Sequence, residues 1–198
     1  MHVDCNSEKC ILVFDYFQDT LLSLLNNNPS LSPDERPKIM RSVGEAVNQL
    51  HSRDWVHSDI KPDNVFVNWT SDQEGNKVIT KTVLGDFDIA CKLKDGETRI
   101  TPHAVGNVMW RSPEAQACMA NKATDIYSLG LVAFQSAAEG ADAEVKERPE
   151  MRMEYWTQEL GASTFDLLSQ LTNLDPRARP NITDVLAHPY WKDSLPEH

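Results

Sequence analysis

The sequence lacks any apolar run long enough to cross a membrane. Its longest apolar segments, ILVF at 11–14 and LGLVAF at 129–134, are much shorter than the roughly 20 residues that a transmembrane helix needs. The first ten residues, MHVDCNSEKC, also lack the apolar core of a secretory signal peptide. We therefore expect a soluble intracellular protein, cytoplasmic or nuclear, with no membrane partner.

Paired cysteine motifs and an excess of positive charge are absent as well. None of the four cysteines forms a C-x-x-C pair, which argues against a zinc site or a redox motif and favours reduced structural thiols at Cys5, Cys10, Cys91 and Cys118. Nineteen lysines and arginines against 30 aspartates and glutamates give a net charge of −11. Because nucleic-acid phosphates require a basic surface, this charge argues against a nucleic-acid partner. Nothing in the sequence indicates an oligomeric state.

The chain contains no internal repeat and reads as one compact unit. At 198 residues, folding is expected to bury roughly 70% of the surface of the unfolded chain, so no disulfide or structural metal is needed to stabilise the core. CILVFDYF at 10–17 is rich in branched and aromatic residues and predicts a buried strand followed by a connector. VFVNW at 65–69 and VITKTVL at 78–84 predict two short strands, with Gly75 and Asn76 in the turn between them.

An amphipathic helix is predicted between these strand segments. It begins with Ser32 as N-cap and Pro33 at the first helical position, and Glu35 completes a capping box. It ends near Arg53. The apolar residues of this helix recur at helical spacing, at Ile39, Val43, Ala46, Val47 and Leu50.

Three more helices are expected in the second half of the chain. Residues 125–138 are apolar on nearly every side, which predicts a central buried helix. STFDLLSQLTNL at 163–174 and NITDVLAHPYW at 181–191 predict two further helices, opened by Ser163 and Asn181.

Two neighbouring stretches carry an unusual concentration of polar groups. VHSDIKPDNVFV at 56–67 and LGDFDIA at 84–90 contain oxygen ligands of the kind that Mg²⁺ prefers, at Asp59, Asn64 and Asp86. Lys61 is a point charge suited to a phosphate oxygen. Together these residue types indicate phosphoryl transfer, which needs neutralised phosphate charge, bridging metal ions and a carboxylate placed at the attacking hydroxyl. Each Asp or Asn taken alone could instead cap a turn.

The spacing of these residues resembles that of protein kinases. Asp59, Lys61 and Asn64, followed after the strand pair by Asp86, resemble the catalytic-loop and D-F-G signatures. The resemblance extends over nearly the whole chain. ILVFDYF resembles the fifth strand and hinge, WRSPE at 110–114 the A-P-E element, DIYSLG at 125–130 the start of the F helix, and DPRARP at 175–180 the segment before the last helix.

The resemblance implies catalytic roles for four residues. Asp59 would be the catalytic base that orients the substrate hydroxyl, and Lys61 would contact the transferred phosphate of ATP. Lysine two residues after the aspartate is similar to serine/threonine kinases, so a protein substrate with a serine or threonine acceptor is implied. Asn64 and Asp86 would hold Mg²⁺.

The resemblance also implies a nucleotide site at the hinge. The backbone groups of Asp15 and Phe17 would meet adenine, with Phe14 as the gatekeeper and Phe66 below the base. Two structural contacts are implied as well. Glu114 would pair with Arg179, and Asp125 would support the catalytic loop from beneath, while His57 would pack in the core.

In fold class, the resemblance implies a kinase-like α+β domain, seen here mainly as the helical C-terminal lobe with a few short strands. Residues 1–17 would be a remnant of the N-terminal lobe and the hinge, and residues 18–198 would be the C-terminal lobe. No G-x-G-x-x-G occurs in the sequence, and Lys9 is the only lysine before the hinge. We therefore expect a truncated kinase, from a shortened gene product or an incomplete gene sequence, and little or no phosphate transfer by the 198 residues alone.

Three positions depart from the kinase pattern. Ser58 stands where the family usually carries arginine, and Asp88 replaces the glycine of D-F-G. Asn107 stands where a threonine usually contacts the catalytic aspartate, and an amide can also form a hydrogen bond there. Thr98 and Thr101 in the activation segment are candidate phosphorylation sites.

These departures leave a second function open, a catalytically inactive kinase-like lobe that acts as a binding or scaffold module. A third reading, a small metal-dependent hydrolase built on Asp59 and Asp86, accounts for the carboxylates but for none of the later motifs.

Overall fold

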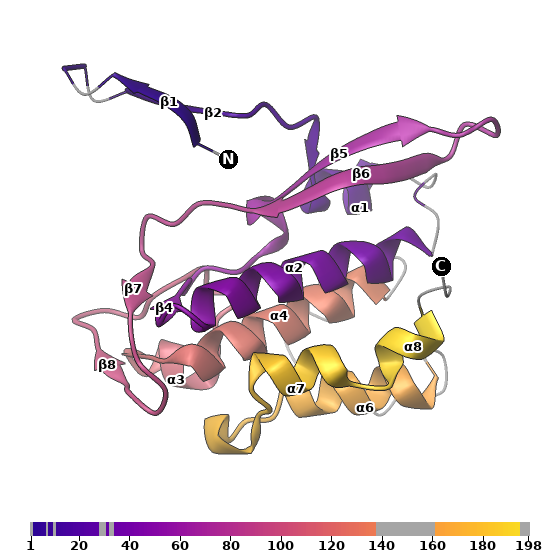
Figure 1. Ribbon diagram of the computed structural model, residues 1–198. Helices are drawn as coiled ribbons and strands as arrows, with labels where there is room; N and C mark the ends of the chain where they lie inside the picture. The colour runs from indigo at the N-terminus through magenta and orange to yellow at the C-terminus, as the bar shows by residue number, and fades with distance from the viewer. Residues whose placement is uncertain are drawn as a thin grey trace.

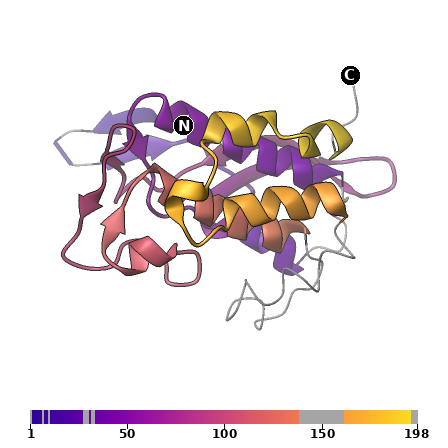
Figure 2. The same cartoon turned by 90° about the horizontal axis from the view of Figure 1, so that it is seen from below.

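Two long helices form the centre of the structure. α2 (Glu35–His51) and α4 (Lys122–Ala137) pack against each other, and α6 (Ala162–Leu171), α7 (Ile182–Ala187) and α8 (Tyr190–Ser194) cover them from one side (Figure 1). Figure 2, seen from below, shows these three helices lying across that side. This computed structural model describes residues 2–6, 8–9, 11–27, 31, 34–137 and 161–194. Within these ranges, no helix combines the length and apolar character that a membrane crossing requires.

The amphipathic pattern predicted for the first helix is confirmed in α2. One face of the helix is buried in the main apolar core, at Ile39, Met40, Val43 and Val47. The N-cap residue is Asp34, while Ser32 and Pro33, predicted to open the helix, lie outside the described residues.

The predicted capping-box partner of Glu35, Ser32, lies outside the described residues, but two other contacts of Glu35 are described. Its side chain is buried, and its carboxylate accepts hydrogen bonds from the backbone N–H of Ile79 at 2.8 Å and from Lys38 Nζ at 2.6 Å. Ile79 lies in strand β6 (Lys77–Leu84), so Glu35 links α2 to the sheet.

The predicted strand pair is confirmed as the antiparallel hairpin of β5 (Val65–Ser71) and β6, with β3 (Asp19–Thr20) on the other side of β5. Gly75 in its turn has a φ of +85°, a conformation that glycine adopts without strain. Val65 pairs with Leu84 at the opposite end of the hairpin. This register places residues 56–64 and 85–90, the two polar stretches, next to each other.

The central buried helix is confirmed as α4. Its core-facing residues include Ile126, Leu129 and Val132. Gly130 allows α6 to approach closely, because a Cβ at this position would lie 2.7 Å from Leu171 Cβ. Ala138, predicted to be in this helix, lies outside the described residues.

The last helices differ from the prediction in detail. α6 begins at Ala162 after Gly161, whose φ is +80°, so Ser163 lies inside the first turn and does not cap it. Asn181 caps α7 as predicted, since its side chain accepts a hydrogen bond from the Asp184 N–H at 3.0 Å. The helix predicted for 181–191 is divided, because α7 ends at Ala187 and α8 begins at Tyr190.

Short elements connect these parts. α1 (Leu21–Asn27) follows β3, and the 3₁₀ turns η1 (Pro62–Asn64) and η3 (Pro176–Ala178) precede β5 and α7. β4 (Trp55–Val56) pairs with β7 (Cys91–Lys92), and β8 (Arg99–Ile100) pairs with β9 (Met119–Ala120). α3 (Pro113–Gln116) lies between β8 and β9 in the chain.

The burial predicted for the strand in residues 10–17 is wrong at Val13 and Phe14. β1 (His2–Asn6) and β2 (Ile11–Phe14) form a separate two-stranded sheet that projects from the body (Figure 1). Val13 is 44% exposed and Phe14 is 60% exposed. Branched and aromatic residues favour a strand, but burial requires a second layer.

Candidate active site

A buried carboxylate supports the loop that holds the candidate catalytic residues. Asp125, in the first turn of α4, accepts hydrogen bonds at 2.8 Å from the backbone N–H groups of His57 and Ser58. Its Oδ2 also lies 3.0 Å from His51 Nε2. The support predicted for Asp125 is therefore confirmed, and it holds Ser58 in a left-handed conformation with a φ of +69°.

The structure brings Asp59, Lys61 and Asn64 together. Lys61 Nζ lies 2.6 Å from Asp59 Oδ2, and Asn64 Nδ2 lies 3.3 Å from the same oxygen and donates to the Asp59 carbonyl at 2.9 Å. η1 produces this proximity, because Pro62 turns the chain so that Asn64 faces back toward Asp59. The side chains of Lys61 and Asn64 therefore converge on one carboxylate oxygen of Asp59.

The charge of Lys61 is stabilised by its surroundings. The hydrogen bond to Asp59 raises the pKa of Lys61, partial burial opposes this, and the negative charges of Asp59, Asp86 and Asp63 raise it further. Lys61 therefore stays protonated over the neutral range and can present a positive charge to a phosphate oxygen.

Asp86 lies on the adjoining segment, one residue beyond Gly85. The Gly85 N–H donates to the Asn64 carbonyl at 2.9 Å, and the Gly85 carbonyl lies 3.0 Å from His57 Nε2. His57 is fully buried, as predicted, and its ring packs 4.9 Å from that of Phe87. These contacts join the two polar stretches, while the Asp86 side chain itself is exposed.

Backbone strain falls on Asp86 and not on Asp88. Asp86 has a φ of +64°, in the region where aspartate is tolerated better than most residues. Asp88 lies in a turn closed by the Ala90 N–H and the Phe87 carbonyl at 3.0 Å, and its φ is not positive. Aspartate in place of the usual glycine is therefore compatible with the local backbone.

The predicted adenine-site residues divide into two groups. Phe17 and Phe66 lie close together, with ring centroids 6.0 Å apart, and Phe66 packs so near Gly85 that a Cβ there would lie 2.8 Å from its ring. Phe14 lies at the end of the exposed hairpin. Asp15 is 3.0 Å from Lys81 Nζ of β6, and the hydrogen bond and charge of Lys81 lower the pKa of Asp15.

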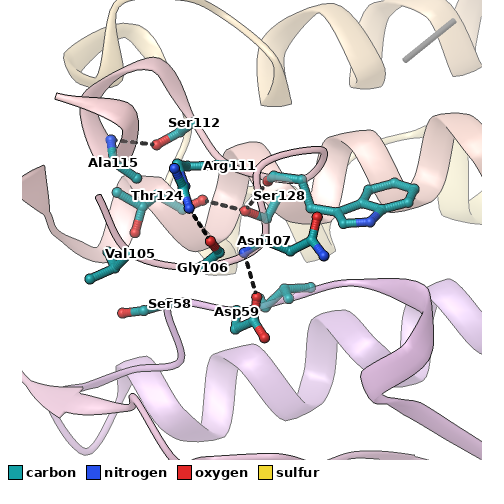
Figure 3. A pocket seen from close by; sticks show the side chains of 12 residues that line it. Ser58, Asp59, Val105, Gly106, Asn107, Arg111, Ser112, Ala115, Thr124 and Ser128 are labelled. Carbon is teal, nitrogen blue, oxygen red and sulfur yellow. Dashed lines mark hydrogen bonds between the residues drawn. The ribbon is translucent and has the colours of Figure 1, made fainter. Parts of the chain in front are cut away.

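Asn107 contacts Asp59 through its backbone and not through its side-chain amide. The Asn107 N–H donates to Asp59 Oδ1 at 2.8 Å (Figure 3), whereas the Asn107 Oδ1 accepts from the Met109 N–H at 2.9 Å. Of the two candidate phosphorylation sites, Thr98 is exposed, but Thr101 is 9% exposed and its hydroxyl donates to the His103 carbonyl at 2.7 Å. Phosphorylation of Thr101 would require this segment to open.

The pairing predicted between Glu114 and Arg179 is confirmed. Both side chains are buried, and the guanidinium meets the carboxylate through two parallel bonds of 2.5 and 2.9 Å. This pair ties α3 to the segment before α7 and so anchors the end of the activation segment.

Two residues of the loop that faces Asp59, Gly106 and Arg111, were not identified from the sequence. Gly106 has a φ of +78°, and its carbonyl accepts a hydrogen bond from Arg111 (Figure 3). The pair Gly106-Asn107 was a possible signal, since glycine and asparagine are both common in turns.

Among the described residues, no cluster of three or more His, Cys, Asp or Glu side chains could hold a metal ion. A cation near Asn64 and Asp86 would therefore need further ligands from a bound molecule. Mg²⁺ fits this donor set, because it is commonly held by one or two carboxylates together with phosphate oxygens.

Comparison with known proteins accounts for this arrangement. Residues 2–191 match the protein kinase domain family. The chain is 29% identical, over 89% of its length, to the membrane-associated tyrosine- and threonine-specific cdc2-inhibitory kinase wee-1.3 of Caenorhabditis elegans. It is 27% identical over 93% of its length to the serine/threonine-protein kinase shk1/pak1 of Schizosaccharomyces pombe. It is 29% identical over 94% of its length to the human phosphorylase b kinase gamma catalytic chain, liver/testis isoform.

The chain spans only 25%, 28% and 48% of the lengths of these three relatives. The family match covers the polar stretches, the A-P-E-like element and the last helices, so a small hydrolase built on two carboxylates alone does not account for the sequence. With its helical body, its small sheets and its ordered motifs, the chain belongs to the protein kinase family.

Proposed function

We propose that this protein transfers the γ-phosphoryl group of ATP to a serine or threonine hydroxyl of a protein substrate. The observation that carries the proposal is the convergence of Lys61 and Asn64 on Asp59, at 2.6 and 3.3 Å from Oδ2. The pairing of Val65 with Leu84 places Asp86 on the adjoining segment. The match to the protein kinase domain supports this assignment.

Each of the three converging residues has a chemical role in the proposal. The Asp59 carboxylate accepts a hydrogen bond from the substrate hydroxyl, orients it and takes its proton. Lys61 presents its ammonium group to the transferred phosphoryl oxygens. Asn64 holds Asp59 in place with its amide N–H, which turns its amide oxygen away from Asp59 and leaves it available as a ligand.

Asn64 and Asp86 are the proposed Mg²⁺ ligands. When bound, ATP and Mg²⁺ supply the phosphoryl group and neutralise its charge. For the nucleotide base, we propose the backbone of Asp15 and Phe17, with Phe14 at its edge and Phe66 beneath it. Residues 1–17 are proposed as strands and hinge of an N-terminal lobe, and residues 18–198 as the C-terminal lobe.

The choice of serine or threonine rests on Lys61, two residues after Asp59. The relatives do not all share one acceptor, since shk1/pak1 is named a serine/threonine kinase and wee-1.3 a tyrosine- and threonine-specific one. Phosphoamino-acid analysis of a labelled substrate distinguishes these acceptors, and phosphotyrosine as the main product would contradict the proposal.

A binding module without turnover is the second candidate. It is favoured by the state of Asp59, whose two oxygens are already bonded, one to Lys61 and the other to the Asn107 N–H. Ser58 also favours a binding module, because it lacks the charge of the arginine that the family usually carries there. In this function the site would bind nucleotide or a protein without transferring phosphate.

The purified chain can be used to separate the two candidates. Transfer of labelled phosphate from ATP to a mixed peptide substrate, abolished by Asp59→Asn, is the result expected of a kinase. A thermal shift with ATP and Mg²⁺ that disappears in Asp86→Asn, without any transfer, would identify the binding module. The absence of both phosphate transfer and a nucleotide-dependent thermal shift at millimolar ATP would contradict the proposed ATP site.

A further inference from the structure

One peptide unit joins Arg111 to the carboxylate of Asp59. The Asn107 N–H donates to Asp59 Oδ1 at 2.8 Å, and the carbonyl of the same peptide, that of Gly106, accepts from Arg111 Nη2. Because this peptide bond is trans, its N–H and C=O point in opposite directions. Arg111 and Asp59 therefore bind its two ends (Figure 3).

Gly106 makes this orientation of the peptide possible. Its φ of +78° lies in the region that side chains rarely adopt, and a Cβ would collide with the Ser58 carbonyl oxygen. The peptide thus lies directly against the loop that carries Asp59. A small shift of this peptide would move the hydrogen bond to Asp59 Oδ1.

Arg111 is itself held in a defined position. Its Nη1 donates to Gln116 Oε1 at 2.7 Å, at the end of α3, while its Nε is buried without a hydrogen-bond partner among the described residues. Partial removal of a guanidinium from water strengthens its charge-assisted bond to the Gly106 carbonyl. That bond in turn polarises the peptide and makes the Asn107 N–H a better donor.

We propose that Arg111 is a positioning residue for Asp59, acting through the Gly106–Asn107 peptide. Lys61 holds one carboxylate oxygen directly, and Arg111 fixes the other through the polarised peptide, so Asp59 is oriented from two sides. This inference rests on the proposed function only for its effect on phosphoryl transfer. The contact itself is a property of the fold.

The first test measures the Asn107 amide directly by NMR and hydrogen exchange. In Arg111→Met, which keeps the packing of the stem but removes the donors, we expect the Asn107 amide proton to move upfield and to exchange about tenfold faster. Arg111→Lys, which can still donate to the Gly106 carbonyl, should retain most of the protection. Arg99→Ala, at an exposed arginine of the same segment, is the matched control.

An Asn107 amide that keeps its shift and its exchange rate in Arg111→Met would overturn the proposal. Gln116→Ala removes only the second partner of Arg111, and a small, partial loss of protection is expected. This readout does not require any enzyme activity, so it remains decisive if the proposed kinase function fails.

The second test uses the rate of phosphate transfer. In a form of the protein that transfers phosphate, Arg111→Met should lower kcat by roughly 10- to 100-fold, because a misplaced base loses much of its effect, and should leave KM for ATP unchanged. In an Asp59→Asn background, Arg111→Met should lower kcat little further, because the carboxylate that Arg111 positions is already gone. Independent losses that multiply in the double variant would show a general structural role and contradict positioning of Asp59.

Discussion

The two hairpins of this chain have similar local sequences but different surroundings. β5–β6 carries Val65 and Val67 with no exposed surface, whereas Val13 in β1–β2 is 44% exposed. β5–β6 is covered by α2 and continued by β3, while β1–β2 forms a sheet of its own. The difference shows that strand-forming residues do not determine burial, which depends on whether another layer covers the strand.

The carboxylate of Glu35 in α2 links the β5–β6 hairpin to the helical body. Glu35→Ala leaves the Ile79 N–H without its acceptor and should lower the free energy of unfolding by about 2–3 kcal/mol. Urea denaturation measures this change. Glu45→Ala, at an exposed position of the same helix, should change it by less than about 0.5 kcal/mol. Equal effects of the two substitutions would mean that the Glu35 contact does not secure the hairpin.

One substitution made in both hairpins tests the comparison itself. Val67→Ala removes fully buried methyl groups and leaves a cavity, so it should cost about 2 kcal/mol of unfolding free energy. Val13→Ala, at a 44% exposed position, should cost less than about 0.5 kcal/mol. Comparable losses in urea denaturation would show that β1–β2 is covered in solution, and the contrast between the hairpins would be wrong.

Asp19 links β3 to β5 and gives the sheet a dependence on pH. Burial, the largest single influence, raises the pKa of Asp19, but bonds from Trp69 and Ser23 together with Lys77 outweigh it and lower the pKa below its ordinary value of 3.8. A lowered folded-state pKa stabilises the protein above that ordinary value, and the stabilisation disappears as pH falls through the folded-state pKa.

The corresponding variant is Asp19→Asn. It should be less stable than the wild type by about 1 kcal/mol at pH 6, where the carboxylate is charged, and the difference should shrink toward pH 3. Thermal unfolding at both pH values measures it. A difference that grows on acidification has the wrong sign for a lowered pKa.

The smallest effect is expected at the exposed pair of Asp15 and Lys81, which links the end of β1–β2 to β6. Both side chains are largely in water, at 39% and 42% exposure, so the pair should contribute little to stability. We expect Asp15→Asn to leave the unfolding transition unchanged. Any contribution of this pair to the salt dependence of the unfolding free energy should disappear in the variant. A clear loss of stability would indicate that the two hairpins are coupled.

The polar stretches were largely predictable because their spacing is a local property. Asp59, Lys61 and Asn64 are separated by a few residues, and a single 3₁₀ turn brings them together. The distant pairs of Asp125 with the loop and of Glu114 with Arg179 were predicted from the family resemblance and are confirmed. Composition and periodicity alone would not have identified either contact.

Other features depended on the fold and were missed. The sequence assigned Glu35 only to its own helix end, and it gave no sign that the Glu35 carboxylate would accept a hydrogen bond from the Ile79 N–H of β6. Asn107 was expected to act through its amide, yet the positive φ of Gly106 turns the backbone N–H toward Asp59 and frees the side chain for Met109. Arg111 had no local motif at all, because its role is defined by a carbonyl that only the folded loop presents.

The sequence by itself determined the longer helices, the β5–β6 hairpin and which residues gather around Asp59, because periodicity and short spacings act within a few residues of chain. The tertiary structure alone decided that β1–β2 stands exposed and that a peptide unit connects Arg111 to Asp59. The physical reason is common to both. Burial and hydrogen-bond partners depend on surfaces that come together only when distant segments pack, and no pattern within one segment encodes which surface it will meet.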